Sequence, residues 1–183
     1  MRRTWSSSKN SWRANCSVVT IADRAAGFGD AGYSMFNVVL VEPEIPPNTG
    51  NIGRLCLATQ STLHLIKPLG FSLDDPHLKR AGLDYWDEVN VQLWNSFYDL
   101  QRGQLPNTRY FFLTTKANRA YYGVTFRPDD FLVFGRETKG LPESLLAANI
   151  DSCITIPMCG TRSLNLATAV AIVLFEAVRQ QQS

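Results

Sequence analysis

One stretch near the start of the core decides the architecture of this 183-residue chain. It reads Val38-Val39-Leu40-Val41-Glu42-Pro43-Glu44-Ile45-Pro46-Pro47-Asn48-Thr49-Gly50-Asn51-Ile52-Gly53-Arg54. Its continuous apolar run is typical of a parallel strand that is buried on both faces. The prolines that follow interrupt the strand, and a helix capped by Asn48 or Thr49 is then expected to run to about Thr59. A buried strand that turns directly into a helix is the first half of an α/β unit.

The same alternation of short apolar runs and helix-like runs continues to the end of the chain. Further strands are expected over 63–66, 89–91, 109–114, 130–135 and 152–157, with helices near 77–81, 96–100 and 142–148. A C-terminal helix carries one apolar stripe of Ala167, Val170, Ala171, Leu174 and Val178, and a second apolar face of Leu166, Val173 and Ala177. That breadth suits a helix packed on the sheet and on a partner. The pattern predicts an α/β fold with a mostly parallel sheet flanked by helices.

The composition excludes several classes of protein. The apolar fraction of 45% supports a sizeable core, and no run reaches the ~18 apolar residues of a membrane span, so no membrane partner is expected. The four cysteines lack Cys-x-x-Cys spacing, and with only His64 and His77 beside them no metal site is expected. Reduced cysteines are typical of the cytoplasm. His64 lies inside an apolar run, which indicates a hydrogen-bonded core or edge histidine rather than a catalytic one.

Residues 1–34 differ from the rest of the chain. They hold five basic residues against two aspartates, a net charge of +3, whereas the remainder holds 13 basic and 14 acidic residues, a net charge of −1. Three interpretations compete: a flexible extension, a transit-like segment, or translated upstream sequence with the working start at Met35. The last is favoured because a strand begins directly after Met35. We expect residues 1–34 to be an irregular, disordered extension and residues 35–183 to form one domain.

Three segments read as loops that hold one ligand. They cover residues 48–54, 134–142 and 156–166, and each combines glycine with polar side chains between a strand-like and a helix-like run. Ligands of open α/β sheets bind beyond the carboxyl ends of the strands, so the loops are expected to converge there. They contain no dinucleotide or Walker fingerprint, no histidine for a Ser-His-Asp triad, and only one carboxylate, Glu137. Backbone amides, hydroxyls and the arginines 54, 136 and 162 suit a nucleoside ligand and an anionic polymer.

These three segments resemble the three motifs of the SPOUT superfamily of S-adenosylmethionine-dependent RNA methyltransferases. The run 41–52, together with Arg80-Ala81-Gly82-Leu83-Asp84-Tyr85 and Leu113-Thr114-Thr115-Lys116, resembles the small tRNA ribose 2′-O-methyltransferases that modify a wobble cytidine or uridine. The match extends from about residue 35 to residue 180. The resemblance implies a C-terminal trefoil knot, a homodimer, a cytoplasmic location, S-adenosyl-L-methionine as the cofactor, tRNA as the partner and no metal.

The resemblance also assigns site residues, position by position. The implied cofactor-binding residues are Leu113, Thr114, Gly135, Glu137, Gly140, Ile156, Met158, Ser163 and Leu164. The implied catalytic residues are Arg54 and Asn165, and the implied substrate-binding residues are Asn48, Arg162 and Tyr85. Since arginine normally stays protonated, Arg54 is expected to orient the ribose and stabilise charge rather than to act as a base.

Alternatives remain open for several positions and for the function. Arg54 could be a helix-surface arginine, Glu137 could cap loop amides, and Tyr85 and Trp86 could either stack RNA bases or pack a loop. The two-faced C-terminal helix could be fully buried in a monomer, although the resemblance favours a homodimer. Ribose methylation of ribosomal RNA or of another tRNA position is a rival with the same chemistry. A non-catalytic RNA or nucleotide binder on the same fold is a rival of another class.

Overall fold

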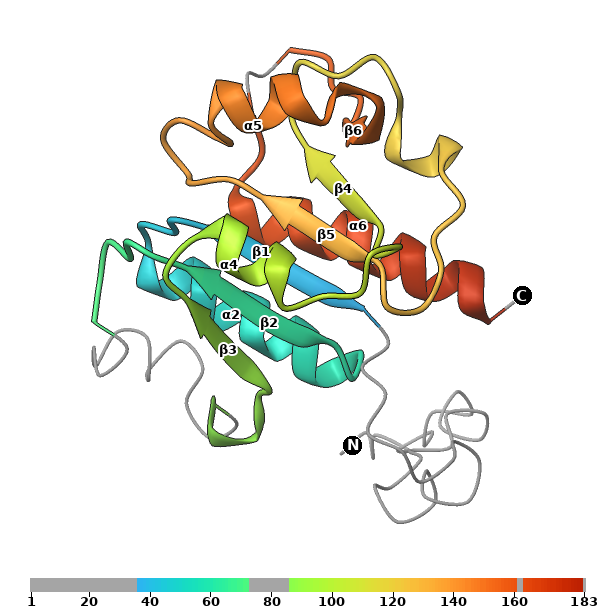
Figure 1. Cartoon of the computed structure of the whole chain (residues 1–183). Helices are drawn as coiled ribbons and strands as arrows, with labels where there is room; N and C mark the ends of the chain where they lie inside the picture. The colour runs from blue at the N-terminus through green and yellow to red at the C-terminus, as the bar shows by residue number, and fades with distance from the viewer. Residues whose placement is uncertain (1–35, 73–85, 161–162, 183) are drawn as a thin grey trace, which may run out of the picture. The chain divides into compact units, whose positions relative to one another are not determined.

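A six-stranded parallel sheet forms the centre of the part of the chain that the structure describes (Figure 1). In this computed structural model, that part comprises residues 36–72, 86–160 and 163–182. The strands are β1 (Asn37–Val41), β2 (Thr62–Ile66), β3 (Val91–Trp94), β4 (Tyr110–Leu113), β5 (Phe131–Phe134) and β6 (Cys153–Ile154). They lie in the order β3-β2-β1-β5-β4-β6, and each pair is parallel. The predicted α/β fold with a parallel sheet is therefore confirmed.

Helices cover both faces of this sheet. The α-helices are α2 (Pro46–Ala58), α4 (Phe97–Arg102), α5 (Glu143–Ala148) and α6 (Leu166–Gln181), and the short 3-10 helices are η2 (Trp86–Glu88), η3 (Tyr121–Gly123) and η4 (Ile150–Ser152). Val38 and Leu40 of β1 belong to the apolar cluster that contains α2 and α6. Val39 and Val41 belong to the cluster that contains α4 and α5. Because neighbouring side chains of a strand point to opposite faces, the apolar run of β1 supplies both clusters.

Two predictions about boundaries are wrong. Helix α2 begins at Pro46, and neither Asn48 nor Thr49 caps it. Proline fits the first helical turn because its fixed φ is helical and its missing N–H has no partner there in any helix. The third strand covers 91–94 rather than 89–91, because it pairs with β2 only from Val91 onward. The helix predicted near 77–81 lies outside the described residues.

Helix α6 buries both of its predicted apolar faces in one core cluster, because Leu166, Val173 and Ala177 lie there with Val170 and Leu174. The prediction that the second of these faces packs on a partner is therefore wrong. Val170, Val173 and Leu174 are fully buried in the cluster that also contains residues of α2. Phe175 lies on the outer side and exposes 47% of its surface. The helix therefore covers the sheet with one face and presents a large aromatic ring on another.

His64 is a hydrogen-bonded core histidine, as predicted. Its side chain lies in β2, is 2% exposed, and contacts Asn37 and Trp94. The indole N–H of Trp94 donates to Nδ1 of His64 over 3.0 Å, so Nδ1 must carry the lone pair. The proton of the neutral ring then lies on Nε2, which donates to Oδ1 of Asn37 over 3.0 Å. Burial lowers the pKa of His64 to about 4, and a second proton on the ring would face the Trp94 donor.

This arrangement predicts a fall in stability on mild acidification. The folded-state pKa of about 4 lies below the ordinary value of 6.5, so the unfolded chain binds the proton first as the pH falls. The stability from neutral His64 is fully present above pH 6.5 and is lost as the pH falls toward 4. Between pH 7.5 and pH 5, we expect wild type to lose about 2 kcal/mol more unfolding free energy than His64→Gln.

Urea unfolding of both proteins at the two pH values measures this difference. All other titrating groups are shared by the two proteins and cancel in the comparison. Parallel losses in wild type and in His64→Gln would show that His64 is not the responsible group.

Candidate active site

A cavity of about 510 Å³ lies beyond the carboxyl ends of β4, β5 and β6. We call it the loop cavity. Its walls come from residues 113–116 after β4, residues 134–141 after β5, and residues 155–158 and 163–166 after β6. Ile45 and Asn48, from the start of α2, complete the lining. The carboxyl ends of parallel strands meet at one edge of the sheet, so loops that are far apart in the sequence converge there.

All nine residues that the sequence assigns to cofactor binding line the loop cavity. They are Leu113, Thr114, Gly135, Glu137, Gly140, Ile156, Met158, Ser163 and Leu164. Asn48 and Asn165 line it as well. Contact of these residues with a cofactor stays a prediction. Arg162 and Tyr85 lie outside the described residues.

The loop after β5 closes so tightly that it requires glycine twice. A Cβ atom on Gly135 would lie 2.1 Å from the carbonyl carbon of Gly140, a separation that no side chain can occupy. Gly140 has φ +69°, in the left-handed region that favours glycine. The N–H of Gly140 donates to the carbonyl of Arg136 over 2.9 Å and closes the turn. The wall of the cavity is therefore backbone at this point.

Glu137 joins the loop after β5 to the segment between β1 and α2. Its carboxylate accepts hydrogen bonds from the backbone N–H of Glu44 at 2.9 Å and of Ile45 at 3.3 Å. It also accepts one from the side-chain amide of Asn48 at 3.0 Å. This carboxylate therefore caps loop amides, the alternative that the sequence left open, while the residue still lines the loop cavity.

Asn165 extends this connection to the third loop. Its side-chain N–H donates to Oδ1 of Asn48 over 2.9 Å. Its own Oδ1 accepts from the backbone N–H of Ala167 at 2.9 Å and of Thr168 at 3.3 Å, which caps α6. The chain Glu137–Asn48–Asn165 thus links the loops after β5 and β6 to the first turn of α2 through side chains alone. The predicted loop 48–54 is helical, because α2 covers Pro46–Ala58.

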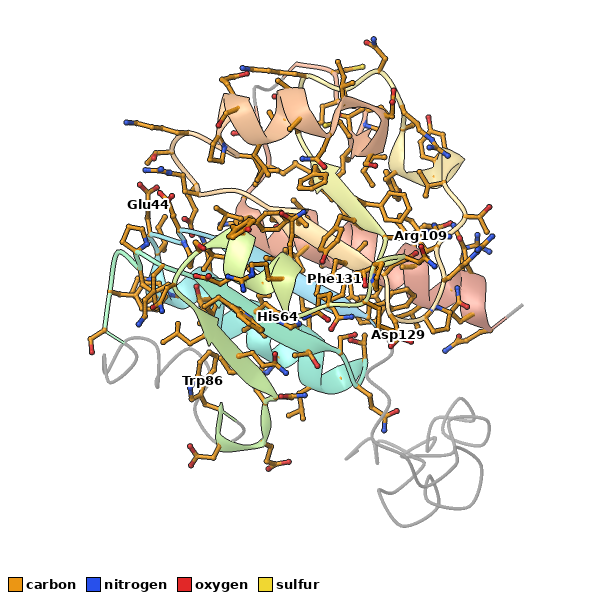
Figure 2. All side chains as sticks on the ribbon, in the orientation of Figure 1. Glu44, His64, Trp86, Arg109, Asp129 and Phe131 are labelled. Atoms are coloured by element: carbon orange, nitrogen blue, oxygen red, sulfur yellow. The ribbon has the colours of Figure 1, made fainter. Side chains whose placement is uncertain are left out.

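Acidic side chains of the first loop add two further links. The carboxylate of Glu44 accepts hydrogen bonds from the hydroxyl and the N–H of Thr138, and the hydroxyl contact lowers the pKa of Glu44. Glu42 forms an ion pair with Arg136. Sequence reasoning missed both links, although two carboxylates within one proline-bounded turn were a usable signal. Figure 2 shows Glu44 at the end of the sheet where the loops gather.

Arg54 lies on α2 but does not line the loop cavity. Its side chain is exposed, whereas its neighbours Ile52 and Gly53 are buried. It follows Asn48 by six residues, which places it about 9 Å further along the helix axis. Trp86 of η2 packs against the neighbouring Gly53, where a Cβ would lie 2.8 Å from the Trp86 ring. Trp86 also packs against the core cluster, so the packing interpretation holds for this residue.

The polar and apolar groups of the loop cavity define what it can bind. No group of three His, Cys, Asp or Glu side chains among the described residues is arranged to hold a metal ion. The carboxylates of Glu44 and Glu137 are occupied by hydrogen bonds between loops. What the loop cavity offers is exposed backbone, apolar side chains such as Leu113 and Ile156, and hydroxyls. Across the residues that the structure describes, no helix is long and apolar enough to cross a membrane.

The sequence model of the SpoU rRNA methylase family matches residues 35–175. The chain belongs to this family. Among curated SpoU-type relatives, a tRNA (cytidine(34)-2′-O)-methyltransferase from Polaromonas sp. is 49% identical over 151 residues, covering 80% of this chain and 91% of its own length. The enzyme of the same name from Yersinia pestis is 48% identical over 152 residues, covering 80% of this chain and 94% of its own length.

Solved structures of SpoU methyltransferases share the fold. A structure described as giving insight into 2-OH methylation of C/U34 on tRNA is 44% identical, with a TM-score of 0.78, and the match covers 83% of this chain and 99% of that one. An AdoMet-bound rRNA methyltransferase from Sinorhizobium meliloti is 25% identical, with a TM-score of 0.73. The match to that protein covers 82% of this chain and only 58% of the other.

The link through Glu137 predicts that Glu137→Gln lowers stability and weakens ligand binding in the loop cavity. The amide keeps one acceptor oxygen but points an NH₂ group at a backbone donor. Loss of one such bond at a half-buried site costs about 1 kcal/mol, which lowers the melting temperature by roughly 2–4 °C. Glu143→Gln is the matched control, because Glu143 also lines the cavity but is exposed and forms an ion pair with the exposed Lys116.

Thermal unfolding of the two variants beside wild type makes the comparison. We expect Glu143→Gln to melt with wild type. Equal melting temperatures for all three proteins would contradict the role assigned to Glu137.

Proposed function

We propose that this protein transfers a methyl group from S-adenosyl-L-methionine to the ribose 2′-hydroxyl of the wobble nucleotide of tRNA, a cytidine or uridine. One observation carries the proposal. The nine residues that the family resemblance assigns to the cofactor come from separate loops, and all of them line one cavity of about 510 Å³. That volume suits a nucleoside-sized ligand. Relatives with this activity match over more than nine-tenths of their own length.

The chemistry of the loop cavity fits the proposed cofactor. Leu113, Ile156 and Met158 offer apolar contact for a purine ring, and the backbone at Gly140, where a Cβ would meet nothing within 4 Å, is open to close approach. Thr114, Ser163, Glu137, Gly135 and Leu164 would complete the cofactor site. When bound, S-adenosyl-L-methionine supplies an electrophilic methyl group. AdoMet-bound structures of relatives in this family support the assignment.

The protein's own part in the reaction is mainly positioning. The ribose oxygen forms a bond to the methyl carbon as the carbon–sulfur bond breaks, and the hydroxyl proton leaves. Holding the hydroxyl in line with that bond supplies much of the rate. Arg54 would orient the ribose and its phosphate and stabilise the developing negative charge on oxygen. Asn165, whose side chain is fixed by Asn48 and by the first turn of α6, would hold the nucleotide.

Substrate contacts would come from Asn48, Arg162 and Tyr85. Ribosomal RNA is the weaker substrate candidate, because the tRNA methyltransferases are 48–49% identical to this chain, whereas the rRNA methyltransferase from Sinorhizobium meliloti is 25% identical. A non-catalytic binder would bind cofactor and RNA without transferring the methyl group, so turnover separates it from the enzyme.

Arg54→Ala should reduce methyl transfer to tRNA by about 10²–10³ and leave cofactor affinity within a few-fold. Loss of one preorganised charge-stabilising group typically has this effect on rate, and Arg54 does not line the loop cavity. Arg54→Lys should restore activity only in part, because the compact charge of a lysine ammonium group does not replace the paired donors of a planar guanidinium group. Single-turnover transfer from labelled cofactor and calorimetry of cofactor binding separate the two effects.

Arg102→Ala is the matched control, since Arg102 is an exposed arginine that stacks over Tyr98 on α4. It should behave as wild type. Near-normal turnover by Arg54→Ala would show that Arg54 is a surface residue without a role in catalysis. Absence of cofactor binding by wild type at millimolar concentration would overturn the proposed function. Loss of activity with a chelator would overturn the expectation that the reaction needs no metal.

The protein should form a homodimer through α6. Phe175 on the outer side of α6 gives this helix an apolar surface beyond the sheet contact.

The family match begins at residue 35, which supports assigning residues 35–183 to the methyltransferase domain and residues 1–34 to an extension. Light scattering at micromolar concentration should give twice the chain mass both for the full chain and for a version starting at Met35. A monomer mass for the full chain would contradict the homodimer. A monomer mass for the shorter version alone would contradict the assignment of residues 35–183 to the whole methyltransferase domain.

Two further properties follow from the family resemblance. We propose that the C-terminal segment forms a trefoil knot, which the likeness in fold at a TM-score of 0.78 supports. A crystallographic trace of residues 110–182 would test it. We also propose a cytoplasmic location, supported by a tRNA substrate and by free thiols at Cys56, Cys153 and Cys159. Fractionation of cells that carry a tagged chain would test the location.

A further inference from the structure

A second cavity, of about 580 Å³, opens at the amino ends of β4 and β6. We call it the arginine cavity. Its lining residues are Thr108, Arg109, Tyr110, Phe111, Arg119, Val124, Thr125, Arg127, Asn149, Asp151 and Ser152. It therefore lies at the edge of the sheet opposite to the loop cavity, and Figure 2 shows Arg109 and Glu44 at these opposite ends.

The arginine cavity concentrates positive charge. Three of the seven arginines among the described residues line it, against one lining carboxylate, Asp151. Arg109 is held in place by Asp130, at 3.2 Å from its Nε, and by the carbonyl of Thr125 at 2.7 Å. In the described part of the chain, Arg119 and Arg127 form no salt bridge, and both are exposed.

The polar groups around these arginines suit a phosphate. Guanidinium groups match phosphate oxygens with paired donors, and hydroxyl and amide groups complete such sites. Thr108, Thr125 and Ser152 supply hydroxyls, and Asn149 supplies an amide. Apolar lining is a minor part, which argues against a purely hydrophobic ligand.

The backbone that carries Arg119 and Arg127 is fixed. The carbonyl of Arg119 accepts from the N–H of Thr155 over 2.8 Å, beside the bridge that joins Ala120 to Thr155. The N–H of Arg127 donates to the carboxylate of Asp130 over 2.7 Å. A preformed backbone lowers the entropy that binding must overcome.

Helix α6 holds the segment between the two arginines. The side-chain amide of Gln180 donates to the carbonyl of Val124 at 3.0 Å and accepts from the N–H of Phe126 at 2.9 Å. Gln181 donates to the carbonyl of Phe126 at 2.9 Å. Because residues 124–126 are tied to α6, Thr125 and Arg127 are presented from a stable surface.

The two cavities are close enough to contact one RNA molecule. Ser152 lines the arginine cavity and Thr155 lines the loop cavity, and only the two residues of β6 stand between them, a distance of about 10 Å along the strand. That distance is well under one turn of a nucleic acid duplex. The loop after β4 joins the cavities and carries basic side chains to both: Lys116 lines the first and Arg119 the second.

We propose that the arginine cavity binds backbone phosphates of the substrate tRNA and is a docking site separate from the loop cavity. This inference rests on the proposed function, because the RNA is the one that the enzyme methylates. Arg119 and Arg127 contact phosphate, and Arg109 anchors the wall between them. The site fixes where the RNA lies and reads no base, as phosphate contacts do.

The test is the double variant Arg119→Gln/Arg127→Gln of the full chain. Its affinity for tRNA should fall about tenfold at 0.1 M salt, because charge-assisted bonds to phosphate are lost. The slope of log K against log salt should decrease in magnitude by about 1.5, since each phosphate contact contributes roughly 0.7–0.9. The KM for tRNA should rise, while kcat at saturating tRNA, cofactor affinity and melting temperature stay unchanged.

The control removes two positive charges elsewhere, as Lys67→Gln/Arg102→Gln. Lys67 and Arg102 are exposed, and neither lines the two cavities. Equal loss of tRNA affinity in both double variants, or no loss in the first, would overturn the docking site while leaving the proposed function intact. A wild-type protein that neither binds nor methylates tRNA would overturn both. If millimolar inorganic phosphate stabilises wild type but not the variant while tRNA affinity is unchanged, the cavity serves a small phosphate ligand and the docking proposal is wrong.

Discussion

The carboxylate of Glu137 is the contact on which the candidate active site depends. It accepts hydrogen bonds from two backbone N–H groups and from Asn48, and Asn48 in turn accepts from Asn165. Loops after β1, β5 and β6 thereby share one set of side chains. An anionic acceptor strengthens each of these bonds, and three bonds to one carboxylate fix its orientation. Polar contacts thus join the walls of the loop cavity, in addition to the apolar packing of lining residues such as Leu141 and Leu166.

Steric constraints also fix the conformation of the loop after β5. Gly135 and Gly140 let the loop after β5 close on itself, and any Cβ at Gly135 would collide with the backbone of Gly140. Ion pairing of Arg136 with Glu42 and the bond from Thr138 to Glu44 hold the outside of the same loop. The interior of the sheet contains a comparable device, since His64 uses both ring nitrogens to join β1, β2 and β3 through Asn37 and Trp94. In both places a polar group is satisfied on every side, which favours a single arrangement.

The two ends of the sheet carry different chemistry. The carboxyl ends present backbone, hydroxyls and apolar side chains, which suit a nucleoside cofactor, whereas the amino ends of β4 and β6 present guanidinium groups, which suit phosphate. A methyltransferase that acts on one nucleotide of a large RNA needs both kinds of surface. One set of contacts aligns the reacting atoms, and the other holds the polymer in register. Strands β4 and β6 run from one surface to the other, so the length of a strand fixes the distance between the two surfaces.

The sequence by itself determined the fold class and two of the three loops, 134–142 and 156–166, whereas the predicted loop 48–54 lies within α2. Continuous apolar runs such as 38–41 and 131–134 specify strands buried on both faces, and a parallel sheet then brings the following loops to one edge. It also identified His64 as a core residue. It misjudged the start of α2, because Asn48 reads as a helix cap, whereas its amide is taken by Glu137, 89 residues away. Only the tertiary structure decided that Glu42 and Glu44 hold the loop after β5, and that three arginines separated in the sequence line one cavity at the opposite edge. The physical reason is the distance along the sequence over which each interaction acts. Backbone preferences and the alternation of buried residues act between neighbours, so a short stretch of sequence shows them. Side-chain pairing acts between distant segments that only the folded sheet brings together.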